Sequence, residues 1–186
     1  MVLRRGSETA PEYDAIVIGA GVGGLYQLYR LLEMGKRVLV LEAGDGVGGV
    51  WYWNRYPGAR LDSESYSYAY SFSGELLEEW NWSEHFASQP EMLRYYNHVA
   101  DRFGLRPHIR FGKRVSRARY DEDQASWSVF TEDGDAYLCR YLITAIGPLS
   151  APTYPRIKGR ETFAGESYHT SRWPLDPVSL DGRRIA

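Results

Sequence analysis

The stretch that decides the fold runs from Tyr13 to Gly44 and reads YDAIVIGAGVGGLYQLYRLLEMGKRVLVLEAG. Its first part, Asp14 to Gly19, is an apolar run with the length of a strand that is buried on both faces. Leucines then recur at helical spacing until Gly35, which is placed to end a helix. A second apolar run, Arg37 to Leu41, follows directly. The order strand, helix, strand predicts a βαβ unit with a right-handed crossover.

A second helix is predicted farther along the chain. Ser88 to Glu91 reads SQPE, which has the form of a capping box with a proline in the first turn. An apolar stripe at helical spacing follows and stops at Gly104, so we expect one face of this helix to lie on the core. The stripe consists of Met92, Tyr96, Val99 and Phe103.

Three short alternating runs lie between Val115 and Cys139, and an Asp-Gly pair at 133–134 favours a hairpin turn. They predict a small antiparallel meander inserted in the sheet. Tyr141 to Ile146 reads as a further buried strand, separate from the meander. The expected fold class is therefore α/β, a Rossmann-like three-layer fold with a parallel sheet and a small antiparallel β-meander.

The chain is expected to divide into three parts. Residues 1–12 read as a disordered arm, and residues 13–147 hold the predicted sheet and helices. Four prolines after Pro148 interrupt any regular element, so residues 148–186 look like an extended connection. A chain of 186 residues can bury one core of useful size.

Composition limits the partners. The formal net charge is −2, so no basic field predicts nucleic acid or an anionic membrane surface, and small molecules are the expected partners. Cys139 is the only cysteine and the four histidines lack ligand spacing, so no disulfide or metal site is expected. The lone cysteine fits a reducing compartment, and no apolar run reaches the length of a membrane span, which together favour a cytoplasmic protein.

The turn between the first strand and the first helix carries G-x-G-x-x-G at Gly19, Gly21 and Gly24. Such glycines allow a tight turn, close approach of the backbone to a pyrophosphate, and close packing of helix on strand. Glu42 ends the second strand, 18 residues after Gly24, where a carboxylate can accept both ribose hydroxyls. We interpret this as a dinucleotide site rather than a purely structural glycine turn. The carboxylate disfavours a 2′-phosphate, so FAD or NAD is expected here and NADP is not.

The stretch GDGVGGVWYWNRYPGARLDSESYSY, residues 44–68, bears on the choice between FAD and NAD. Gly48 and Gly49 allow a second close approach of the backbone to a ligand. The aromatic side chains of this stretch offer flat apolar surface to a ring system: Trp51, Tyr52, Trp53, Tyr56 and Tyr68. On composition alone, an aromatic-rich core loop is the more common explanation.

These motifs together resemble the N-terminal part of Baeyer-Villiger monooxygenases, class B flavoprotein monooxygenases similar to the phenylacetone and cyclohexanone enzymes. GAGVGG resembles their FAD fingerprint and GGVWYWNRYPGARLD their flavin-contacting loop. FAGESYHTSRWP, residues 163–174, resembles their signature F-x-G-x-x-x-H-x-x-x-W-P. The related N- and S-oxygenating flavin monooxygenases usually lack the Trp-Pro ending seen at Trp173 and Pro174.

The resemblance implies residue roles. Gly19, Gly21, Gly23 and Gly24 would lie along the FAD pyrophosphate, and Glu42 would bind the adenosine ribose. The flavin half would be contacted by Gly49, Val50, Trp51, Asp62 and Tyr68, and the adenine side by the backbone of Val115. Arg60 and Asp62 would border the nicotinamide of NADPH, with Asp62 positioning a catalytic arginine; a local ion pair between Arg60 and Asp62 is the alternative. His169 would be a hinge or relay element.

The resemblance also implies an activity, in which NADPH reduces the flavin and O2 then converts a ketone to an ester or lactone. It further implies that the chain stops before a second, NADPH-binding domain, so residues 1–186 alone are expected to be inactive and to need the missing C-terminal domains. Residues 13–147 would form the FAD-binding domain, and residues 148–186 the inter-domain linker. Three alternatives remain open: a non-catalytic FAD-binding module, an N/S-oxygenating monooxygenase and an NAD-dependent dehydrogenase.

Overall fold

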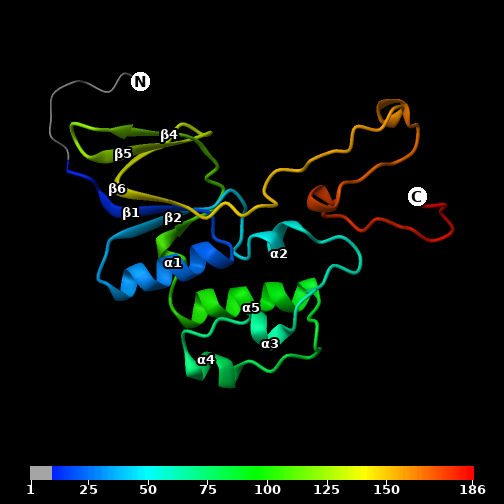
Figure 1. Ribbon diagram of the computed structural model, residues 1–186, viewed down its shortest axis with the longest axis horizontal. Coiled ribbons are helices and arrows are strands. Elements are labelled where there is room, and N and C mark those ends of the chain that lie inside the picture. The colour runs from blue at the N-terminus through cyan, green and yellow to red at the C-terminus, as the bar shows by residue number, and fades with distance from the viewer. Residues whose placement is uncertain (1–9) are drawn as a thin grey trace.

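The computed structural model describes residues 10–186, so most of the predicted N-terminal arm lies outside the described residues. Strands of this part form a six-stranded sheet with the order β3-β2-β1-β6-β5-β4 (Figure 1). The strands are β1 (Tyr13–Ile18), β2 (Val38–Leu41), β3 (Ile109–Arg110), β4 (Val115–Asp121), β5 (Ser126–Thr131) and β6 (Ala136–Thr144). The pairs β3-β2, β2-β1 and β1-β6 are parallel, whereas β6-β5 and β5-β4 are antiparallel.

Two long helices and several short ones accompany this sheet. The helices are α1 (Val22–Glu33), α2 (Val50–Trp53), α3 (Ser65–Tyr68), α4 (Gly74–Glu79) and α5 (Gln89–Arg102). Single 3-10 turns are η1 (Arg106–His108), η2 (Arg160–Thr162) and η3 (Thr170–Arg172). No helix in residues 10–186 combines the length and the apolar character that crossing a membrane requires.

The predicted βαβ unit is confirmed. β1 and β2 pair in parallel from Ala15↔Val38 to Ile18↔Leu41, and α1 connects them. The chain leaves the helix through Gly35, whose φ of 67° is easily reached only by a residue without a side chain. The local sequence pattern is enough to predict this unit, because the glycine, the leucine spacing and the apolar runs all favour the same structure.

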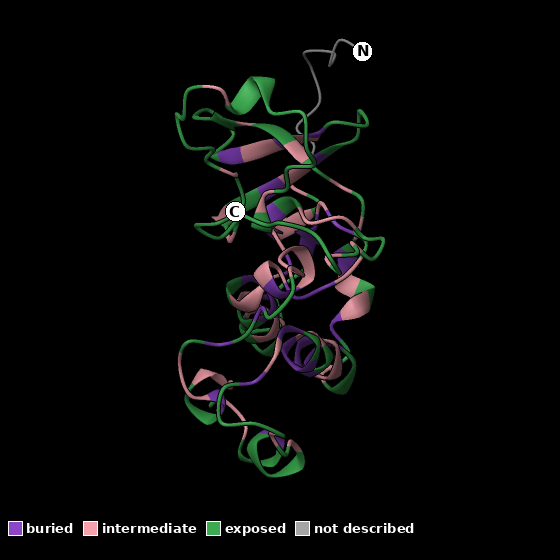
Figure 2. Ribbon diagram, turned by 90° about the vertical axis from the view of Figure 1, so that its right-hand side faces the viewer, coloured by how far each residue is buried: buried purple, intermediate pink, exposed green. Residues whose placement is uncertain are grey.

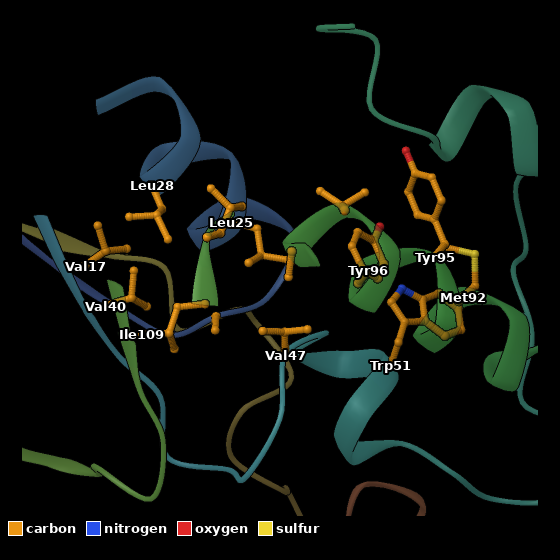
Figure 3. Packing of buried hydrophobic residues seen from close by; sticks show 14 of the residues in the cluster. Val17, Leu25, Leu28, Val40, Val47, Trp51, Met92, Tyr95, Tyr96 and Ile109 are labelled. Atoms are coloured by element: carbon orange, nitrogen blue, oxygen red, sulfur yellow. The ribbon is translucent and has the colours of Figure 1, made fainter. Parts of the chain in front are cut away.

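The predicted three layers are also confirmed. On one face of the sheet, Val17 and Val40 pack against Leu25 and Leu28 of α1, and the same core continues to Met92 and Tyr96 of α5 (Figure 3). On the opposite face Ile16, Leu39 and Leu41 pack with Val129, Tyr137 and Cys139 of the meander. Figure 1 shows β4 and β5 on the side of β1 that faces away from α1. β1 and β2 are therefore covered on both faces, as their continuous apolar runs require.

The meander is confirmed, but the prediction of a separate strand at Tyr141–Ile146 is wrong. β6 is one strand of nine residues that belongs to both parts of the sheet. Its first half pairs antiparallel with β5 as far as Cys139, and its second half pairs parallel with β1 from Cys139 to Thr144. Tyr141 is also 62% exposed, because no helix covers this part of the strand. No turn residue separates the two apolar runs, so both form part of one continuous strand.

α5 confirms the predicted helix, but the prediction of a capping box at its start is wrong. Ser88 occupies the N-cap position and its side chain makes no capping hydrogen bond. Glu91 instead accepts hydrogen bonds from the backbone N–H of Ser83 at 3.0 Å and from its hydroxyl at 2.6 Å. Glu91 is buried, so its carboxylate needs these donors, and they lie in the preceding loop rather than in the helix itself.

Residues 148–186 differ from the rest of the described chain. They contain only η2 and η3 as regular elements and extend away from the sheet (Figure 1). Their ribbon is mostly of the exposed class (Figure 2). The extended character predicted from the prolines is therefore confirmed, whereas the role of this segment as a linker between domains stays a prediction.

Candidate dinucleotide-binding cleft

A cleft of about 630 Å³ lies at the carboxyl ends of β1 and β2. In open α/β sheets this is the edge at which ligands bind. Five segments meet there: the glycine turn, the end of β2, the loop that holds α2 and α3, the start of β4, and the chain that follows β6. Residues from them that line it include Gly19, Gly21, Gly23, Glu42, Gly49, Val50, Trp53, Tyr68, Lys113, Val115, Ile146 and Arg172.

The glycine turn has the geometry that its spacing predicts. Gly19 has φ 101°, and a Cβ atom there would lie 2.7 Å from the carbonyl oxygen of Ala145. A Cβ atom on Gly24 would lie 1.8 Å from the carbonyl oxygen of Gly19, so a methyl group cannot fit between α1 and β1. Both glycines are thus required by the fold itself. This supports the predicted turn and the close packing, and it leaves their contact with a ligand as a prediction.

Gly21 and Gly49 bring two backbone turns into contact. A Cβ atom on Gly49 would lie 2.7 Å from the Cα atom of Gly21, and Gly49 has φ 57°. Gly21 is also the N-cap of α1, and no side chain caps this helix. The first-turn N–H groups of a twelve-residue helix therefore lie beside a bare backbone surface. This arrangement suits an anion such as a pyrophosphate.

Glu42 is buried at the wall of the cleft, with 4% of its surface exposed. Its Oε2 accepts the backbone N–H of Ala20 at 2.6 Å and its Oε1 accepts that of Gly44 at 2.8 Å. The carboxylate therefore ties the glycine turn to the end of β2, a structural role that the sequence did not reveal. Each oxygen keeps further acceptor capacity, so the same group can also receive ribose hydroxyls.

The aromatic loop divides between cleft and core. Val50, Trp53 and Tyr68 line the cleft, but Trp51, which the resemblance places on the flavin, has its side chain in the core cluster. Its indole ring meets the Tyr68 ring edge-on at 5.9 Å, with Trp51 Nε1 3.4 Å from the Tyr68 hydroxyl. This position fits the alternative of an aromatic core residue, and contact of Trp51 with the flavin stays a prediction. Trp53, which the resemblance did not single out, contributes the wall of the cleft instead.

Arg60 and Asp62 lie outside the residues that line the cleft. Arg60 Nη1 donates to Glu84 Oε2 at 2.9 Å, and the backbone of Arg60 bridges to Ser88. The predicted alternative of an ion pair between Arg60 and Asp62 is therefore wrong, since Glu84 takes that place. Asp62 is exposed. Both side chains face solvent on the loop, where contact with a further ligand or domain stays a prediction.

Val115 and Lys113 both line the cleft. No sequence motif indicates Lys113. Lys113 Nζ lies 2.5 Å from Asp133 Oδ2 and 2.8 Å from Asp135 Oδ2. The hydrogen bonds that Lys113 donates to the two aspartates raise the pKa of Lys113, and they lower the pKa of Asp133 to about 2. The two carboxylates thus compensate the charge that Lys113 brings to this wall. Only the fold of the meander brings these residues together.

The signature at residues 163–174 makes mostly local contacts. His169 caps η3, with its Nδ1 accepting the backbone N–H of Ser171 at 3.1 Å, and its ring packs against Tyr154. The ring of Phe163 lies over Gly165, where an added Cβ would come within 2.6 Å of it. His169 does not line the cleft, whereas Arg172 does. The expected hinge or relay role of His169 stays a prediction.

Comparison with known proteins agrees with this geometry. The family model described as pyridine nucleotide-disulphide oxidoreductase matches residues 16–177. A 2-oxo-Δ3-4,5,5-trimethylcyclopentenylacetyl-CoA monooxygenase of Pseudomonas putida is 52% identical over 182 residues, which are 95% of this chain and 33% of that protein. A cyclohexanone 1,2-monooxygenase of an Acinetobacter species is 45% identical over 94% of this chain and 32% of that protein.

Solved structures show the same relationship. A steroid monooxygenase bound to NADP superposes with a TM-score of 0.84 and 54% identity, over 91% of this chain and 33% of that one. A complex of OTEMO with FAD and NADP superposes with a TM-score of 0.85 and 54% identity, over 91% of this chain and 32% of that one. The chain therefore spans about a third of the length of the relatives it matches, which include a protein named Baeyer-Villiger monooxygenase from Pseudooceanicola batsensis. By fold, glycine turn and sequence, the chain belongs to the pyridine nucleotide-disulphide oxidoreductase family, and the relatives it resembles are Baeyer-Villiger and related flavin monooxygenases.

Proposed function

We propose that residues 13–147 form the FAD-binding part of an NADPH- and O2-dependent monooxygenase that converts ketones to esters or lactones. The observation that carries this proposal is the cleft, where an uncapped helix N-terminus, bare glycine backbone and a buried carboxylate converge. These features match the pyrophosphate and the adenosine ribose of a dinucleotide. The names and bound cofactors of the relatives support the choice of FAD and NADPH.

Each end of the cleft would hold a different part of FAD. Glu42 accepts the ribose hydroxyls, the backbone at Gly19, Gly21, Gly23 and Gly24 faces the pyrophosphate, and the backbone of Val115 borders the adenine. Gly49, Val50 and Tyr68 lie toward the flavin. The site contains an acceptor carboxylate, and two aspartates already pair with Lys113 beside it, so it is poorly suited to a 2′-phosphate. FAD, rather than NADPH, is therefore assigned to this cleft.

The bound flavin would supply hydride acceptance from NADPH and the activation of O2. The chain's own residues bind and orient it: the glycine turn fixes the phosphates, and the apolar walls at Val50, Trp53 and Tyr68 limit water at the ring. Arg60 and Asp62 are proposed to meet NADPH from their exposed loop, with Asp62 positioning a cationic side chain from outside this chain. The ketone, the remaining domains and a cytoplasmic location also belong to this proposal.

A second candidate rests on one finding. A phenazine N-monooxygenase of Lysobacter antibioticus is 45% identical over 93% of this chain, the same identity as the acetone and cyclohexanone monooxygenases. Oxidation of a ring nitrogen is therefore an alternative to oxidation of a ketone. Both candidates use the same FAD site, so they differ in the product and not in the role of this cleft.

FAD binding tests the proposal. Titration of the purified chain with FAD and with FMN, followed by flavin fluorescence, should give a dissociation constant for FMN at least tenfold higher, because FMN lacks the adenosine part that Glu42 binds. Equal affinity for FMN, or preferential binding of NAD, would contradict the assignment. Product analysis of the whole enzyme with a cyclic ketone and with an aromatic N-heterocycle then separates lactone from N-oxide formation.

A further inference from the structure

An acidic turn lies beside the end of the cleft that is assigned to adenosine. It joins β5 to β6 and reads EDGD, residues 132–135. The chain that enters β4 carries two cations, Lys113 and Arg114, and both line the cleft. The backbone N–H of Lys113 donates to the carbonyl oxygen of Glu42 at 2.8 Å. The two cations therefore branch from the chain directly beside the residue that is proposed to bind the ribose.

Each of these two cations is paired with the acidic turn. Lys113 Nζ donates to Asp133 Oδ2 at 2.5 Å and to Asp135 Oδ2 at 2.8 Å. Arg114 Nε lies 3.8 Å from Glu132 Oε2, and the N–H of Glu132 donates to the carbonyl oxygen of Arg114 at 2.9 Å. Three negative charges thus face two positive charges at this wall of the cleft.

Two of the three carboxylates are held in place by buried neighbours. Asp133 Oδ1 accepts a hydrogen bond from the hydroxyl of Thr131 at 2.5 Å, and Asp135 Oδ2 accepts one from the hydroxyl of Tyr137 at 2.9 Å. Thr131 and Tyr137 are only 4% and 8% exposed. An isolated surface ion pair contributes little, but a hydrogen-bonded network on buried anchors fixes the positions of its charges.

We propose that this acidic turn decides which nucleotide the cleft accepts, by keeping Lys113 and Arg114 from binding a phosphate on the ribose. This role rests on the proposed function, in which one enzyme uses both FAD and NADPH. The two cofactors differ at the adenosine, because NADPH carries a 2′-phosphate there and FAD does not. A cation beside the ribose accommodates a 2′-phosphate, so an FAD cleft that is lined by two cations needs their charge neutralised.

Glu42 makes only part of this selection. Its two oxygens already accept backbone N–H groups, from Ala20 at 2.6 Å and from Gly44 at 2.8 Å, and these donors stabilise its negative charge. The N-terminus of α1 adds positive potential at the same edge of the sheet. A lysine carries its charge on a flexible four-carbon stem, so an unpaired Lys113 can turn toward a phosphate on the ribose. The selection therefore depends also on the charges of the acidic turn.

Binding of ADP-ribose and of ADP-ribose 2′-phosphate provides the test, because these two ligands differ only in the phosphate at issue. Isothermal titration calorimetry at low ionic strength should show that the wild-type chain binds ADP-ribose at least tenfold more tightly. Asp133→Asn/Asp135→Asn should tighten binding of ADP-ribose 2′-phosphate about tenfold and leave ADP-ribose unchanged, because Lys113 is then unpaired. Both amides keep an oxygen that can accept the hydroxyls of Thr131 and Tyr137, so the turn should keep its fold.

Two further variants separate the acidic turn from a general change of charge. Glu122→Gln/Asp123→Asn removes the same number of charges from the exposed turn between β4 and β5, and it should leave both dissociation constants at wild type. Lys113→Met, added to Asp133→Asn/Asp135→Asn, should abolish the gain for ADP-ribose 2′-phosphate, because the lysine is the group that this phosphate would bind.

The outcomes distinguish this role from the proposed function. Unchanged binding of ADP-ribose 2′-phosphate in folded Asp133→Asn/Asp135→Asn, or a gain that survives Lys113→Met, would overturn the role of the turn and leave the FAD site as proposed. A wild-type chain that binds neither FAD nor ADP-ribose would contradict the proposed function, and this role with it. If the double variant fails to fold by circular dichroism, the two single variants decide: each should gain about threefold, and a gain in neither would overturn the proposal.

Discussion

The βαβ unit at residues 13–44 and the segment at residues 148–186 carry the two most specific motifs of the sequence, yet they fold in opposite ways. In the first, Ile16, Val17 and Leu28 are completely buried. In the second, Phe163 is 64% and Leu175 79% exposed. The glycine motif completes its geometry within its own unit, whereas the signature forms one capping contact and adds Arg172 to the cleft. The glycine motif is thus part of a packed core, whereas the signature is held mainly by local contacts.

Limited proteolysis should show the largest difference between the two regions. Among sites in residues 10–186, trypsin should cut first after Arg156, Lys158 or Arg160, where few side chains are buried. Arg119 in β4 is equally exposed but lies in the sheet, so cleavage there requires opening of the fold. We expect a rate difference of about 10³-fold or more, measured by mass spectrometry. First cleavage inside β4–β6 would contradict the boundary near residue 147.

Truncation of one leucine in each region gives the next largest contrast. Leu28→Ala should lower the free energy of unfolding by about 2–5 kcal/mol, because it leaves a cavity between α1 and the sheet. Leu175→Ala removes an exposed side chain and should change it by less than about 0.5 kcal/mol. Urea denaturation of both variants measures the difference. Equal effects would mean that residues 148–186 pack on the fold in solution.

Two adjacent glycines test the packing of the glycine turn itself. Gly24→Ala should cost about 1–3 kcal/mol, since its Cβ would lie 1.8 Å from the Gly19 carbonyl oxygen. Gly23→Ala is the control, because nothing lies within 4 Å of its added Cβ and alanine favours a helix by up to about 1 kcal/mol. Thermal unfolding should therefore shift in opposite directions. A stable Gly24→Ala would show that α1 can move away from β1 without cost.

Local patterns predicted much of this fold. The βαβ unit, the stripe of α5 and the meander each follow from residues close in the sequence. Errors arose where a partner lies elsewhere. Glu91 has the spacing of a capping box, but it accepts a hydrogen bond from Ser83 instead. β6 joins two apolar runs because β5 pairs with its first half and β1 with its second half.

The same limit applies to the site. Gly19, Gly21 and Glu42 line the cleft, and the sequence indicates them because their motif is a local geometry with a known spacing. Lys113 and Arg172 reach the cleft only through the meander and the C-terminal segment, so no pattern near them indicated it. The neighbours of a residue outside a motif can be read only from the tertiary structure.

Whether Glu42 holds the adenosine half of FAD is decided by the affinity of the chain for FAD, measured for wild type and for Glu42→Gln. The amide can accept only one of the two backbone hydrogen bonds that Glu42 receives, so folding is checked by circular dichroism, and Glu33→Gln on the exposed end of α1 is the control. We expect Glu42→Gln to raise the dissociation constant for FAD at least tenfold and to leave the constant for FMN unchanged, and we expect Glu33→Gln to leave both constants unchanged. An unchanged FAD constant in folded Glu42→Gln would contradict it.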